Sequence, residues 1–144
     1  MRRPLRTFIV LLAITALLAL FVALMPRGYD TDLTRIGKGQ PTAVLTHDPG
    51  FLASVELMEG VNGLRKDFEP ATLFLVADFG TPQGRTFAEE QSVSFGVLVL
   101  FDAQGRRLAS YSGRANAAGL RLFLEQHRRR SGVGAGQRTG KPID

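Results

Sequence analysis

The longest apolar run of the sequence, Phe8 to Met25, contains eighteen residues, of which only Thr15 is polar. As a helix that rises 1.5 Å per residue, the run is roughly 27 Å long, close to the roughly 30 Å hydrocarbon core of a bilayer. A surface helix of a soluble domain would carry a polar stripe, and this run has none. The sequence therefore predicts one transmembrane helix from Phe8 to Met25.

The charges on either side of this run predict its orientation. Three arginines lie within residues 1–7, whereas Arg27 on the other side is soon followed by two aspartates. The positive-inside rule therefore makes residues 1–7 a cytoplasmic basic region of a bacterial inner-membrane protein and places the rest in the periplasm. The alternative is a cleaved signal peptide. The run exceeds the usual roughly seven to fifteen residues and lacks a small-x-small cleavage pair, so we expect an uncleaved signal anchor.

The net charge of +5 does not describe the part of the chain that we expect to fold. Between Asp30 and His127 there are nine basic and twelve acidic residues, so the positive excess belongs to the two ends. This distribution argues against a nucleic-acid groove. Residues 131–144 have no apolar period and are predicted to form a disordered basic tail. Arg128 to Arg130 and Lys141 can engage anionic lipid head groups, but we interpret them as a solvated helix end and tail.

Cysteine is absent from the whole sequence. This excludes disulfides, thiolate nucleophiles, cysteine metal ligands and dithiol redox chemistry. It does not locate the protein, because a lack of disulfides suits either side of a membrane.

The hydrophobic pattern divides the exported part into a linker over residues 26–40 and one domain over residues 41–130. Buried strands are expected at Thr42–Thr46, Thr72–Ala77 and Gly96–Phe101, with a more exposed hairpin strand at Arg106–Ser112. Helices are expected from Pro49, at Arg85–Gln91 and at Ala115–Arg129. The order β-α-β-α-β-β-α predicts an α/β domain with a mixed sheet and helices on both faces.

Two of these helices have a predicted buried stripe. In the first helix, which Asp48 is expected to cap, the stripe is Leu52, Val55, Met58, Val61 and Leu64. In the last helix the stripe is Leu120, Phe123, Leu124 and His127.

The segment GVLVLFDAQGRRLASYSG and the amphipathic helix that follows resemble the C-terminal half of a thioredoxin-fold domain. In that family an aliphatic-aromatic pair ends the strand before the hairpin, and a glycine lies in the hairpin turn. A second glycine follows the last strand, and a Phe-Leu pair ends the final helix. Leu100-Phe101, Gly105, Gly113 and Phe123-Leu124 stand in the corresponding places, and the resemblance covers roughly residues 40 to 128. It implies a thioredoxin-like mixed sheet, which the transmembrane helix predicted from the apolar run would precede.

The residues that carry thioredoxin chemistry are missing. In redox-active members a Cys-X-X-Cys opens the helix after the first strand, where this chain reads HDPGFLAS from His47 to Ser54. Those members place a cis-proline before the third strand, where this chain has Gly96. The resemblance therefore implies a degenerate, redox-inactive domain without a cofactor, retained for binding or scaffolding in protein assembly or maturation.

His47 and Asp48 lie where a strand runs into a helix, a usual place for ligands in α/β sheets. An imidazole beside a carboxylate can act as a general base or bind a metal, which is the alternative function: a cysteine-independent enzyme or metal-binding protein. His127 would complete a metal site only if it lay beside them. The structural alternative, which we favour, is that Asp48 caps the helix and His47 lies at the surface.

The resemblance also places Phe51, Leu52 and Phe95 near the vacated redox site, where an exposed apolar patch would suit an extended peptide or a partner protein. The structural alternative, which we favour for these three side chains, is packing in the core. The predicted partner-binding site comprises six residues: His47, Asp48, Phe51, Leu52, Phe95 and Gly96. We predict no catalytic residue, metal or cofactor, and a periplasmic or membrane protein as the partner. A third hypothesis is that the transmembrane helix itself docks to another membrane protein.

Overall fold

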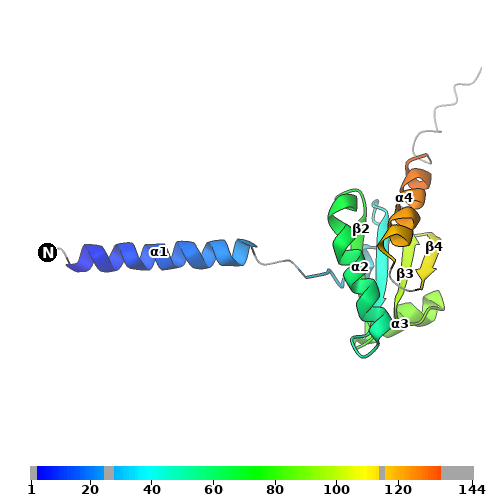
Figure 1. The fold of residues 1–144 in the computed structure, drawn as a ribbon, viewed down its shortest axis with the longest axis horizontal. Helices are drawn as coiled ribbons and strands as arrows, with labels where there is room; N and C mark the ends of the chain where they lie inside the picture. Colours follow the sequence, from blue (N-terminus) through cyan, green and yellow to red (C-terminus); the bar gives the residue numbers. More distant parts are fainter. Residues whose placement is uncertain (1–2, 25–27, 114–115, 134–144) are drawn as a thin grey trace, which may run out of the picture.

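A computed structural model describes residues 3–24, 28–113 and 116–133 (Figure 1). The elements before the sheet are α1 (Arg3–Leu24) and a short 3-10 helix, η1 (Leu33–Arg35). The domain consists of β1 (Thr42–His47), α2 (Leu52–Phe68), β2 (Leu73–Asp78), α3 (Pro82–Gln91), β3 (Val97–Phe101), β4 (Arg107–Ser112) and α4 (Ala117–Val133). This is the predicted β-α-β-α-β-β-α order.

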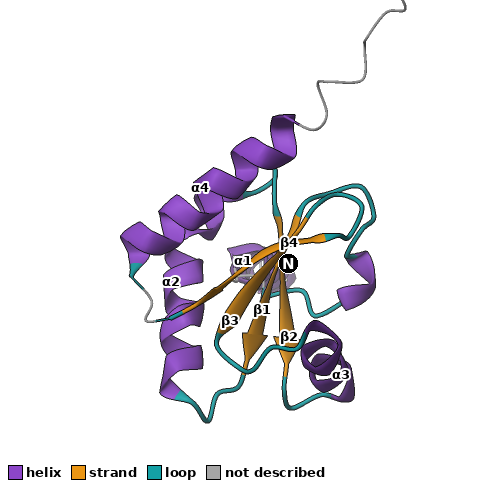
Figure 2. Cartoon of the chain, turned by 90° about the vertical axis from the view of Figure 1, so that its right-hand side faces the viewer, coloured by secondary structure: helices purple, strands orange, loops and turns teal. Residues whose placement is uncertain are grey.

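The four strands form one mixed sheet in the order β2-β1-β3-β4. β1 pairs in parallel with β2 and antiparallel with β3, which pairs antiparallel with β4. The two central strands are buried almost throughout, as their continuous apolar runs predicted, while the edge strand β4 is largely exposed. α2 and α4 lie on one side of the sheet and α3 on the other (Figure 2).

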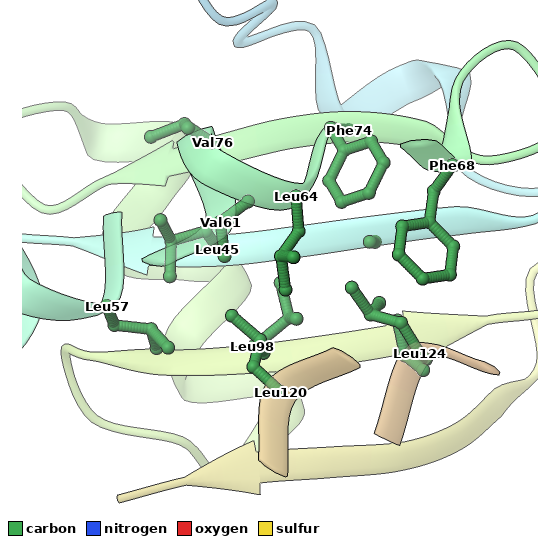
Figure 3. Packing of buried hydrophobic residues seen from close by; sticks show 12 residues of the cluster. Leu45, Leu57, Val61, Leu64, Phe68, Phe74, Val76, Leu98, Leu120 and Leu124 are labelled. Carbon is green, nitrogen blue, oxygen red and sulfur yellow. The ribbon is translucent and has the colours of Figure 1, made fainter. Parts of the chain in front are cut away.

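The main core lies between the sheet and the helices α2 and α4. The α2 face of this core is formed by Leu57, Val61, Leu64 and Phe68, and α4 contributes Leu120 and Leu124 (Figure 3). A second core on the α3 side contains Phe87, Val99 and Phe101. Burying both faces of the sheet removes most of its apolar surface from water, which is the main favourable term in folding.

The structure corrects the predicted start and face of the first domain helix. Asp48 does not cap it: α2 begins at Leu52, after Phe51, and has no side-chain cap. Its buried residues are Ser54, Leu57, Val61, Leu64 and Phe68, and Leu52 is 73% exposed. The predicted stripe was therefore wrong over its first two turns, because Val55 and Met58 are only partly buried while Leu57 takes the buried position. Contact with the sheet sets the register of the helix.

The other helix boundaries shift by a few residues. α3 begins at Pro82 rather than Arg85, because the Thr81 hydroxyl accepts a hydrogen bond from the Gly84 backbone N–H at 3.0 Å and caps the helix. α4 continues to Val133, past the predicted end at Arg129. Within its predicted stripe, Leu120 and Leu124 are buried whereas Phe123 and His127 are partly exposed.

The segment predicted as a linker contacts the domain at several points. The Asp30 carbonyl accepts a hydrogen bond from the Val76 backbone N–H at 3.0 Å, which joins the segment to the edge of β2. Leu33 and Ile36 pack against the core on the α3 side. Gly37 lies against the β3–β4 turn, where a side chain would meet the Gln104 carbonyl oxygen at 3.0 Å and would be strained by a φ of +78°.

The large apolar side chains described in α1, from Val10 to Val22, are exposed, with fractions from 50% at Ile14 to 68% at Leu17. Among the residues that the structure describes, no helix has the length and apolarity needed to cross a membrane. Met25, the predicted end of the span, lies outside the described residues. The transmembrane assignment of Phe8 to Met25 stays a prediction.

Candidate functional site

The end of β1 leads into a tight turn before α2. His47 closes the strand, and the Asp48 carboxylate accepts a hydrogen bond from the Gly50 backbone N–H at 2.9 Å. This short-range bond stabilises the turn, as aspartate side chains often do in loops. Asp48 therefore has a structural role, although in the turn rather than in the predicted helix cap.

Ser54 joins this turn to α2 and was not predicted as a site residue. It is fully buried, and its hydroxyl accepts a hydrogen bond from the Asp48 backbone N–H at 2.9 Å. The same oxygen lies 3.0 Å from Nδ1 of His47. Because the Ser54 hydroxyl is fully buried, a substrate cannot reach it. Its contact with His47 therefore holds the turn in place. Its spacing of three and seven residues from Leu57 and Val61 was the available signal of burial.

A second loop, immediately before β3, faces the start of α2. The Gly96 backbone N–H donates to the Thr46 carbonyl at 2.9 Å. The hydroxyl of buried Thr46 donates to the Ser94 carbonyl at 2.7 Å and accepts from the Val97 backbone N–H at 3.0 Å. These bonds hold the loop on the end of β1.

The backbone at Gly96 suits glycine and excludes proline. Its φ of +70° is far from the roughly −65° that a proline ring imposes, and proline has no N–H to donate to Thr46. A side chain at this position would approach the Ser54 backbone nitrogen to 3.3 Å. Gly96 therefore lies against the first turn of α2.

Three aromatic rings gather at this end of the sheet. Phe51 stacks on Phe95 with ring centroids 3.7 Å apart and an interplanar angle of 17°. Phe79 meets Phe95 edge to face at 6.3 Å and 77°. Phe51 is 45% exposed and its neighbour Leu52 is 73% exposed. We call Phe51, Leu52, Phe79 and Phe95 the aromatic patch; Phe79, which directly follows β2, was not predicted to belong to it.

The predicted site residues thus divide into two groups. His47, Asp48 and Gly96 make backbone or local side-chain contacts that shape the two loops, whereas Phe51, Leu52 and Phe95 form an apolar surface. His127 lies elsewhere, beside Pro41 and Thr42 at the start of β1, whereas His47 is at the end of that strand. Among the described residues, no group of three or more histidine, cysteine, aspartate or glutamate side chains is placed to hold a metal ion.

Comparison with known proteins gives matches of structure alone. No protein-family model and no curated protein sequence matches the chain. Thioredoxin from Fasciola hepatica superposes with a TM-score of 0.54 at 23% identity, covering 63% of this chain and 84% of that one. Thioredoxin O2 from Arabidopsis thaliana gives 0.55 at 15% identity, over 65% and 83%. A thioredoxin from Thermus thermophilus gives 0.61 at 12% identity, over 83% and 100%.

Identities this low establish the fold and leave the activity open. The sheet order, the two helices packed on one face and the third on the other agree with that fold. Because the chain contains no cysteine, it has no dithiol with which to exchange disulfides. The protein has a thioredoxin-like fold that lacks the cysteine pair of a dithiol oxidoreductase.

Proposed function

We propose that this chain is a membrane-anchored, redox-inactive thioredoxin-like module that binds a protein partner in the periplasm during assembly or maturation. The aromatic patch is the binding surface. α1 holds the domain at the inner membrane, with the N-terminus in the cytoplasm. The partner is a periplasmic or membrane protein that presents an apolar segment.

The exposed Phe51–Leu52 pair carries this proposal. Exposure of large, adjacent apolar side chains to water is unfavourable, and the free energy falls when a partner covers them. The Phe51–Phe95 stack fixes one ring in place, so little side-chain entropy remains to be lost on binding. Rigid aromatic anchors of this kind are common at the centres of protein interfaces.

The anchoring part of the proposal is supported by the exposed apolar side chains of α1 and by the arginines before it. Among the described residues of the following segment, Tyr29 contacts the domain, and its ring lies beneath Arg65. Five peptide links join Leu24 to Tyr29, so these residues are at most about 18 Å apart. The domain therefore stays close to whatever surface binds α1.

Site-specific photocrosslinking in intact cells tests the binding surface. A photoreactive side chain at position 52 should capture a partner, and Phe51→Ser should reduce that capture strongly. The same probe at Leu122, which is 56% exposed on α4, is the matched control. Equal capture from positions 52 and 122, or capture that survives Phe51→Ser, would refute the aromatic patch as the binding surface.

Two measurements test the location. The full chain should stay in the membrane fraction after an alkaline carbonate wash. A single Leu122→Cys substitution, at an exposed α4 position outside the aromatic patch, should react with a membrane-impermeant maleimide once the outer membrane is permeabilised, without background because the chain has no other cysteine. Release by carbonate contradicts anchoring, and protection of the cysteine contradicts export.

The cysteine-independent enzyme or metal-binding protein remains a second proposal, because His47 and Asp48 lie at the same strand end. The double variant His47→Ala, Asp48→Ala separates the two proposals. Loss of a bound metal or of an activity with partner capture intact would favour the second proposal.

A separate variant tests the third hypothesis, in which the membrane helix docks to another membrane protein. Replacement of residues 8–25 by an unrelated apolar span of equal length should leave crosslinking from position 52 unchanged if the patch binds the partner. Loss of the crosslink while the chain stays in the membrane would instead assign docking to the helix.

A further inference from the structure

A cavity of about 230 Å³ lies at the end of the sheet opposite the aromatic patch. Its walls come from the start of β1, the residues before β2, the end of β3, the start of β4 and the last turns of α4. Leu108, which lines it, is 40% exposed, so the cavity opens to solvent there. None of its residues belongs to the predicted partner-binding site.

The lining is aliphatic on the inside and cationic at one side. Leu100 and Leu124 are almost fully buried and form an apolar floor. Arg128 supplies the positive charge, with His127 beside it. The His127 ring is held by its own helix, since Nδ1 lies 2.7 Å from the Phe123 carbonyl oxygen, to which it can donate.

The charge of Arg128 has no carboxylate partner among the ion pairs of the described residues. Its guanidinium instead lies 5.7 Å from the centre of the Phe68 ring. A cation–π contact orients a guanidinium without neutralising it, so the positive charge stays available to an anion. A carboxylate is a suitable ligand for Arg128, because a guanidinium can donate two parallel hydrogen bonds to one carboxylate.

From this combination we infer that the cavity binds a small organic carboxylate with an apolar body, the acid group at Arg128 and the body over Leu100 and Leu124. The volume is below the roughly 300–1,000 Å³ of pockets for drug-sized ligands. It therefore suits a single ring or one short chain. The inference does not depend on the proposed binding function, since it concerns the opposite end of the sheet.

Methyl NMR of the full chain in lipid nanodiscs tests the inference with two probes of opposite charge. 3-Phenylpropanoate should shift the methyl signals of Leu100 and Leu124 in a saturable way. 3-Phenylpropylammonium has the same apolar body with a positive charge, and should bind at least about tenfold more weakly, because charge-assisted hydrogen bonds contribute more than 1.4 kcal/mol. Equal affinity for the two probes, or no shift with 3-phenylpropanoate, overturns the inference.

Two neighbouring arginines provide a matched pair of variants. Arg128→Gln should weaken 3-phenylpropanoate binding about tenfold. Arg129→Gln removes the same charge from an exposed residue that does not line the cavity and should leave the affinity unchanged. Equal losses in both variants would mean that net charge alone, rather than this site, attracts the anion.

A third variant tests the cavity itself. Leu108→Asp changes an exposed residue, so the fold should tolerate it, and it adds a negative charge to the lining. It should abolish 3-phenylpropanoate binding. Retained binding in this variant would place the ligand elsewhere.

Discussion

Tyr29 lies between α1 and the domain. Packing of its ring against the core should stabilise the fold, whereas burial of its hydroxyl should destabilise it. The ring packs against the main core, with the Arg65 guanidinium carbon 4.6 Å from its centroid. The hydroxyl is buried, and although the Arg65 side chain lies close enough to lower its pKa, no described group meets the geometry of a hydrogen bond to it. Burial raises the pKa of the Tyr29 phenol, and the nearby Arg65 charge offsets only part of that increase.

Two substitutions at Tyr29 should therefore change stability in opposite directions. A buried polar group without a partner costs about 1–3 kcal/mol, so Tyr29→Phe should raise the free energy of unfolding by about 1 kcal/mol. Tyr29→Ala removes the packed ring as well. For a partly buried aromatic side chain it should lower that free energy by about 2 kcal/mol, below the roughly 3–5 kcal/mol of fully buried rings.

Thermal unfolding of the full chain in detergent, followed by circular dichroism, measures both effects. In a domain of this size, 1 kcal/mol corresponds to about 4–8 °C in Tm. Tyr111, the other tyrosine, packs on Phe123 with ring centroids 5.4 Å apart and provides the control Tyr111→Phe, which should give no gain. A lower Tm for Tyr29→Phe, or an unchanged Tm for Tyr29→Ala, would refute the placement of this residue.

Because the pKa of the Tyr29 phenol is raised, the free energy of unfolding should also depend on pH in the alkaline range. The unfolded phenol begins to ionise near its usual pKa of about 10, while the folded one stays neutral to higher pH. The stability contributed by the neutral phenol of the folded state is complete below the pKa of the unfolded state. It is lost as the pH rises through the pKa of the folded state. Tyr29→Phe should remove this part of the alkaline loss of stability.

Three further predictions concern single positions. Gly84→Ala should lower the urea midpoint sharply, because its Cβ would fall 1.9 Å from the Asp78 carbonyl oxygen, and a cost of about 3 kcal/mol is expected. Gly63→Ala, at an α2 position with nothing within 4 Å, should instead raise the free energy of unfolding by about 0.5–1 kcal/mol, and a loss there would contradict the open space. Although burial acts to raise it, hydrogen bonds from the backbone and side chain of Arg106 hold the pKa of Asp102 below its usual value. The resulting stability is complete above about pH 4 and is lost as the pH falls through the lowered pKa. Asp102→Asn should therefore lower the Tm at neutral pH and flatten its decline in acid, and a parallel acid decline would contradict this assignment.

The sequence alone determined the secondary structure in outline, because that information is local. The runs Thr42–Thr46, Thr72–Ala77 and Gly96–Phe101 are apolar apart from threonines at their ends, and each of them is a buried strand to within one residue at either end. The absence of cysteine was equally decisive, since no tertiary arrangement can supply a missing thiol. Helix beginnings were less predictable: Asp48 has the chemistry of a cap, yet it bonds within its own turn.

Only the tertiary structure decided which residues meet at the candidate site. Phe51 and Phe95 are far apart in the sequence, and they stack because the loops after β1 and before β3 lie at the same end of the sheet. Ser54 is buried, although its polarity suggested the surface, because the register of α2 turns it toward His47. The apolar Leu52 is turned out to solvent by the same register. A periodic pattern specifies that a helix has a buried face, but contact with the sheet sets which side chains occupy it and which remain exposed to a partner.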